Sequence, residues 1–120
     1  MCNDDFVELD AEQLYNIGEK YRFGDGVEIN TTKAIQYLVK SAERGYAPAE
    51  YRVGQMYELG KYIKANPMLA VFWFSKAAEQ DYGEAQYHLA LCYNRGYGVE
   101  FDLDKANYWF SKAAENGYVF

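Results

Sequence analysis

The chain has 120 residues, 50% of them hydrophobic, and its aromatic residues comprise 13 Tyr, 7 Phe and 2 Trp. This content excludes an intrinsically disordered chain and is sufficient for one domain with a packed core. The formal net charge is −6, and the lysines and arginines are scattered among acidic residues. Both features argue against a nucleic acid or an anionic membrane as partner, because either would require clustered cations.

Two further features bear on the compartment. No apolar run approaches the length of a membrane-spanning helix, and residues 1–10 form an acidic lead-in without the pattern of a signal peptide. Cys2 and Cys92 do not recur at a regular spacing, which predicts reduced thiols rather than a disulfide framework. We therefore expect a cytoplasmic protein.

Capping signals predict a first helical hairpin over about residues 11–46. Asp10 and Gln13 form a capping-box pattern for the first helix, which should end at the glycines of residues 24–26. Asn30 should cap the second helix by accepting hydrogen bonds from its free N–H groups. These two helices are expected to run antiparallel.

The same order of signals predicts two more hairpins, over about residues 47–82 and 83–118. Pro48 suits the first turn of a helix, and Asn66 followed by proline is a strong helix start. Asp102 should cap the last helix. Together with the first hairpin, this gives six helices.

The second helix of each hairpin carries one apolar motif at a spacing of 36 residues. The motif reads AVFWFSKAAE at 70–79, ANYWFSKAAE at 106–115 and, in a weaker form, AIQYLVKSAE at 34–43. Its small and aromatic residues form one continuous helical stripe, which a lone helix could not bury. A fixed period without insertions therefore predicts a repeat array, with Trp73 and Trp109 in the core.

The chain resembles the Sel-like repeat (SLR) family, which is related to the tetratricopeptide repeats. The resemblance covers about residues 11–119, and the third copy carries it best. The matching residues there are Ala85, Leu89, Ala90, Tyr93, Gly96, Gly98, Val99, Asp102, Lys105, Ala106, Trp109, Phe110, Lys112, Ala113, Ala114, Glu115 and Gly117. The second copy departs from the pattern at Lys61-Tyr62-Ile63, where glycines are expected, and at Asp81, which replaces the closing glycine.

The resemblance implies an all-α fold, namely a right-handed superhelix (solenoid) of three 36-residue helical hairpins. It also implies that the first helix of each hairpin lines a concave surface that binds proteins. The expected function is that of a non-enzymatic adaptor or scaffold for a protein or peptide.

A helical wheel of each first helix identifies the side opposite its packed face as the binding surface. The residues predicted there are Tyr15, Glu19, Arg22, Tyr51, Gln55, Glu58, Tyr87, Leu91 and Asn94. The three tyrosines would form a ladder that offers apolar area together with hydroxyl groups. The alternative is that they only flank the core and pack against the next hairpin.

We predict no catalytic residue, no metal and no cofactor. His88 is the single histidine and is expected at the surface, with no second histidine to complete a metal site. Cys92 has no adjacent base or cation that would activate a thiol. The chain offers no set of nucleophile, base and oxyanion donor, so an enzyme is not expected.

The C-terminal face supplies an alternative function. Trp109, Tyr118 and Phe120 form an aromatic end that no following helix would cover. The alternative is therefore a self-associating or regulatory subunit, a homo-oligomer in the first case, that makes its contacts through this face.

Overall fold

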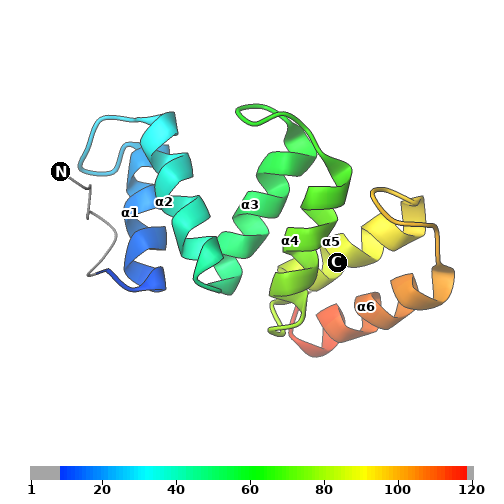
Figure 1. Cartoon of the computed structure of the whole chain (residues 1–120). Helices are drawn as coiled ribbons and strands as arrows, with labels where there is room; N and C mark the ends of the chain where they lie inside the picture. The colour runs from blue at the N-terminus through cyan, green and yellow to red at the C-terminus, as the bar shows by residue number, and fades with distance from the viewer. Residues whose placement is uncertain (1–8, 119–120) are drawn as a thin grey trace.

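The computed structural model describes residues 9–118 and forms three helical hairpins, with no strand among those residues. Figure 1 shows the hairpins side by side along one direction. Most of the predicted acidic lead-in, residues 1–8, lies outside the described residues, as does Phe120. The helices are α1 (Ala11–Phe23), α2 (Thr31–Glu43), α3 (Ala47–Leu59), α4 (Pro67–Ala78), α5 (Gly83–Arg95) and α6 (Leu103–Glu115).

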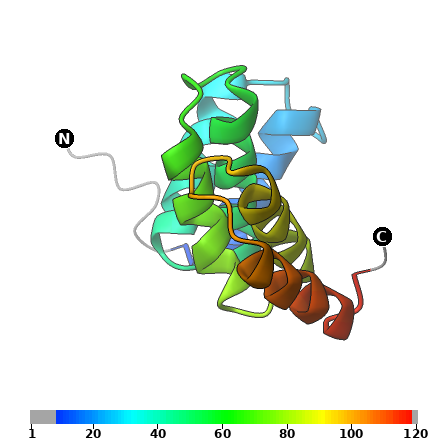
Figure 2. The same ribbon diagram turned by 90° about the vertical axis from the view of Figure 1, so that its right-hand side faces the viewer.

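Each helix packs mainly on the helices that precede and follow it in the chain. The molecule is consequently elongated, with principal extents of 50 × 28 × 25 Å. Figure 2 looks from the α6 end and shows α1 at the far end of the array. This is the all-α solenoid of three hairpins that the sequence predicts, in which neighbouring units bury one another's apolar faces.

The predicted N-caps are confirmed. The Asp10 carboxylate accepts a hydrogen bond from the N–H of Gln13 at 2.8 Å, and the Gln13 side chain returns one to the Asp10 N–H at 2.8 Å. The side chains of Asn30, Asn66 and Asp102 each accept from the N–H three residues on, at 3.0, 3.1 and 3.0 Å respectively. These bonds satisfy N–H groups that a helix leaves free in its first turn.

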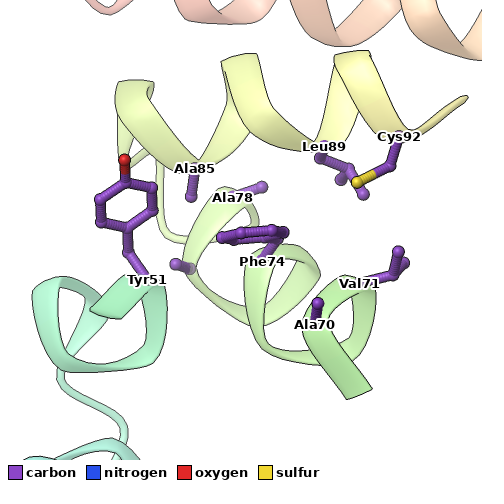
Figure 3. Packing of buried hydrophobic residues seen from close by; sticks show 9 residues of the cluster. Tyr51, Ala70, Val71, Phe74, Ala78, Ala85, Leu89 and Cys92 are labelled. Atoms are coloured by element: carbon purple, nitrogen blue, oxygen red, sulfur yellow. The ribbon is translucent and has the colours of Figure 1, made fainter. Parts of the chain in front are cut away.

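The core lies along the seams between helices, and Figure 3 shows the cluster that contains Phe74. Gly54 of α3 allows this ring to approach, because a Cβ at that position would lie 2.7 Å from Phe74 Cδ1. Trp73 and Trp109 were predicted to be core residues, and the structure corrects this to half-burial at the edge of the core. The fully buried position is the next one along α4, because Phe74 faces the partner helix of its own hairpin.

Candidate protein-binding surface

In each hairpin, one tyrosine of the first helix contacts the tyrosine that follows the second helix. In the first two hairpins, that second tyrosine also immediately precedes the first helix of the next hairpin. Tyr51 is buried, whereas Tyr15 and Tyr87 are half-buried. The predicted ladder is therefore not uniform, and each of its rings is held by a second ring. The ring pairs, with their centroid distances, are Tyr15–Tyr46 (5.4 Å), Tyr51–Tyr82 (5.6 Å) and Tyr87–Tyr118 (5.0 Å).

Tyr51 has only 4% of its surface exposed. Figure 3 shows its ring extending from α3 toward α5. The ring contacts Phe74 at 5.9 Å and His88 at 5.2 Å, and its hydroxyl accepts a hydrogen bond from Gln55 Nε2 at 3.0 Å. Burial also raises the pKa of the hydroxyl to about 12. A partner would therefore find little of Tyr51 to contact, and the ring joins the second hairpin to the third.

The polar residues predicted for this surface are more exposed than Tyr51. The Glu19 carboxylate is 3.6 Å from the Arg22 guanidinium and 3.8 Å from that of Arg52, so it links α1 to α3. Gln55 is half-buried and contacts both Tyr51 and Arg52. Asn94 is exposed, while Glu58 and Leu91 are half-buried. These residues leave accessible side chains on all three first helices.

His88 was expected at the surface, and the structure corrects this placement. Its ring is half-buried between Tyr51 and Phe74, and its Nδ1 lies 3.0 Å from the carbonyl oxygen of Glu84. The expectation for His88 was wrong because this side of α5 faces Tyr51 of α3 and Phe74 of α4. Its role is to pack between hairpins.

Cys92 is buried among apolar residues of the core. Burial raises the pKa of its thiol to about 12, so the thiol stays protonated near neutral pH. This environment disfavours nucleophilic chemistry at Cys92.

Residues that follow α6 partly cover α5, the first helix of the third hairpin. Tyr118 is half-buried against Tyr87, and the Asn116 side chain donates a hydrogen bond to Gln86 Oε1 at 2.9 Å. Trp109 packs at the edge of the core, with Tyr108 exposed beside it. Contact through this face stays a prediction.

One site was missed by the sequence reasoning, namely a pocket of about 320 Å³ between the first and second hairpins. Two residues of the predicted surface, Arg22 and Gln55, line it. The signal that could have located it is the departure at Lys61-Tyr62-Ile63. The full lining is Arg22, Ile29, Thr31, Ala34, Ile35, Leu38, Arg52, Gln55, Met56, Leu59, Lys61 and Tyr62.

The family model of the Sel1 repeat matches the chain three times in succession, over residues 12–46, 47–82 and 83–118. The chain belongs to the Sel1 repeat family. This confirms the resemblance and assigns one repeat to each hairpin. Sel1 repeat proteins are generally non-enzymatic helical scaffolds that bind other proteins. No curated protein sequence matched the chain.

Solved structures of Sel1 repeat proteins have the same fold. A Sel1 repeat protein from Oxalobacter formigenes is 34% identical, with a TM-score of 0.87 over 90% of this chain and 81% of that one. A protective antigen of uropathogenic Escherichia coli strains with an SLR fold is 34% identical, with a TM-score of 0.83 over 89% of this chain. The match spans only 23% of that antigen. Helicobacter pylori cysteine rich protein B is 26% identical, with a TM-score of 0.76 over 89% of this chain and 83% of that one.

No helix within residues 9–118 is both long and apolar enough to cross a membrane.

Proposed function

We propose that this Sel1 repeat protein is a non-enzymatic cytoplasmic scaffold that binds a protein or peptide segment on the surface formed by α1, α3 and α5. The observation that carries the proposal is the row of partly exposed side chains on these three helices, set on a repeat fold whose members generally bind proteins. Tyr15, Gln55 and Leu91 give this row one member on each helix. Their mixture of aromatic, amide and aliphatic groups suits a peptide backbone and its side chains.

The test compares proteins captured by the chain with those captured by a variant of the surface. Leu91→Asp together with Asn94→Arg changes two α5 residues that are at least partly exposed. The matched control is Phe72→Ser, which alters an exposed apolar side chain on the second helix α4. We expect quantitative mass spectrometry to show a partner lost by the α5 variant and kept by the control. Identical capture by both variants, with unchanged circular dichroism, would contradict the proposal.

A second candidate function is contact through the C-terminal face. It is favoured by the exposed aromatic ring of Tyr108 next to half-buried Trp109 on α6. Sedimentation at several concentrations tests self-association, with Tyr108→Ser as the comparison. A mass that rises with concentration and falls in the variant would support self-association through this face, whereas an invariant monomer mass would exclude self-association.

A further inference from the structure

The pocket between the first and second hairpins has an apolar floor and an apolar rim. Ala34 and Leu38 of α2 are buried at its floor, and Met56 of α3 is half-buried beside them. Ile29 and Leu59 are exposed and extend the apolar surface past the pocket mouth. In Figure 1, α2 and α3 separate toward the ends where the α1–α2 and α3–α4 loops lie. An apolar side chain entering from solvent would thus be surrounded by aliphatic groups.

Cations surround this apolar pocket in a chain whose net charge is −6. Arg22, Arg52 and Lys61 line it, and none of the lining residues is acidic. Glu19 lies outside the lining and pairs with both arginines, so one carboxylate faces two guanidinium groups. The site therefore keeps an excess of positive charge, and a guanidinium is well suited to bind a further carboxylate.

The cations do not recur at the next junction of the array. Thirty-six residues on, the positions of Arg22, Arg52 and Lys61 are occupied by Glu58, His88 and Tyr97. The charge is therefore a property of one junction and does not come from the repeat pattern.

The pocket is open because the α3–α4 loop departs from the repeat. In the third hairpin, Gly98 lies so close to α4 that a Cβ there would be 2.4 Å from the carbonyl oxygen of Pro67. Only glycine permits this approach, and it seats Tyr97 and Val99 against the core. Tyr62 occupies the equivalent position in the second hairpin.

Tyr62 cannot adopt the conformation of Gly98. Gly98 has a φ of 72°, whereas among the described residues other than glycine only Asp81 has a positive φ. The loop that carries Tyr62 therefore takes another course and does not close over the start of α2. At one junction the loop packs closely on the start of α4, and at the other Lys61 and Tyr62 of the loop line the pocket.

We propose that this pocket binds an apolar side chain of a partner protein segment that carries carboxylates next to it. The proposal rests on the proposed scaffold function and adds the chemistry of the partner. The aliphatic floor takes the apolar side chain, and Arg22, Arg52 and Lys61 at the pocket bind the flanking carboxylates. The rest of the acidic chain repels such a segment, which restricts it to this junction.

The test begins with a library of displayed random peptides selected on the whole chain. We expect enrichment of peptides in which Asp or Glu stands beside Leu, Ile, Met or Phe, and affinity that falls as salt is raised. The individual peptides so recovered are then titrated against variants by fluorescence anisotropy. Amide chemical shifts of the unaltered chain should move in α2, α3 and the loop at 60–66 when such a peptide is added.

Two variants of exposed pocket residues have controls matched in charge or exposure. Lys61→Glu reverses a cation of the lining, and Lys64→Glu makes the same change in the same loop outside it. Leu59→Ser removes an apolar group of the rim, and Met68→Ser is its control because both side chains are 73% exposed. We expect each pocket variant to weaken binding about tenfold and each control less than about twofold.

Failure of the pocket assignment can be distinguished from failure of the scaffold function. Selected peptides that bind Lys61→Glu and Lys64→Glu equally, or that lack acidic residues, would overturn the pocket assignment and leave the scaffold function standing. Peptides that lose binding only to the variant with Leu91→Asp and Asn94→Arg would also overturn the pocket assignment and leave the scaffold function standing. No enrichment on the folded chain would count against both proposals. A dimer that Lys61→Glu dissociates would overturn the assignment in favour of a second copy as occupant.

Discussion

The ring of Tyr51 lies 5.6 Å from the ring of Tyr82, the residue that ends the second hairpin and immediately precedes α5. Equivalent pairs occur in the first and third copies, so the contact is part of the repeat. It explains why a residue on the expected binding side of α3 is buried. The same hairpin ends by placing an aromatic ring over it, just before α5 begins.

Replacement of Tyr51 should therefore reduce stability more than it alters a surface. Tyr51→Ala removes a buried ring, and we expect a loss of about 3–5 kcal/mol in the free energy of unfolding. Tyr51→Phe removes only the hydroxyl that Gln55 contacts, and should cost about 0.5–1.5 kcal/mol. Urea titration followed by circular dichroism measures both values. Equal and small losses would show that the ring is not part of the core.

The two glycines that face second helices should differ in their tolerance of a methyl group. A Cβ at Gly54 would lie 2.7 Å from a ring carbon of buried Phe74, and at Gly18 it would lie 2.9 Å from Leu38 Cγ. A flat ring held on all sides yields less readily than a leucine side chain.

Overpacking costs about 1–3 kcal/mol, and the gain in helix propensity returns about 1 kcal/mol. We therefore expect Gly54→Ala to lose about 1–2 kcal/mol and Gly18→Ala to lose less. Thermal unfolding of the two variants side by side checks the order. A reversed order would mean that the α3–α4 seam adapts more easily than the α1–α2 seam.

Glu50 should make stability depend on pH. The residue is 1% exposed, and its carboxylate accepts a hydrogen bond from Gln80 Nε2 at 2.8 Å. Burial raises its pKa above the ordinary value, with Lys76 and the Gln80 bond acting in the opposite direction. A carboxyl whose pKa is higher in the folded state contributes stability below its unfolded pKa and loses that contribution as pH rises through the folded pKa.

Glu50→Gln should consequently raise the melting temperature at pH 7 and have less effect at pH 4. The third copy carries Gln86 at this position, where it donates to the Ala78 carbonyl oxygen at 3.0 Å, so an amide fits the site. Glu100→Gln, at an exposed position, is the control for the loss of charge alone. A melting temperature that responds equally to both variants at both pH values would contradict the role of burial.

Asp81 closes the second hairpin in a conformation that favours glycine. Its φ is 62°, and the equivalent residues Gly45 and Gly117 have φ values of 91° and 83°. Side chains pay about 1 kcal/mol in this left-handed region, although aspartate tolerates it better than most. We expect Asp81→Gly to raise the free energy of unfolding by up to about 1 kcal/mol and Asp81→Val to lower it, as measured by chemical denaturation. A higher free energy of unfolding for Asp81→Val would contradict the idea that the backbone at Asp81 is strained.

The helix boundaries could be predicted because the signals that set them are local. An Asn66 side chain that caps α4 needs only the N–H three residues on, and the adjacent proline suits any first turn. The period of 36 residues then supplied the architecture, since repeated apolar stripes bury one another only when hairpins stack.

The site was less predictable because burial in an array depends on the neighbouring unit. A wheel of α3 alone places Tyr51 away from its own partner helix and contains no information about Tyr82 or His88. The pocket escaped notice for a related reason. The Tyr62 departure is visible in the sequence, but its effect depends on how closely Gly98 approaches Pro67, and the sequence does not contain that distance.

The contrast between Tyr62 and Gly98 has a consequence for how such an array diversifies. One loop residue sets how closely a loop packs on the neighbouring second helix, and side chains of the first helices set the charge beside it. A few substitutions at one junction are therefore enough to change its recognition chemistry while the fold is kept. Reordering the units would relocate the pocket, so the order of modules with one shared fold carries information that the individual folds do not.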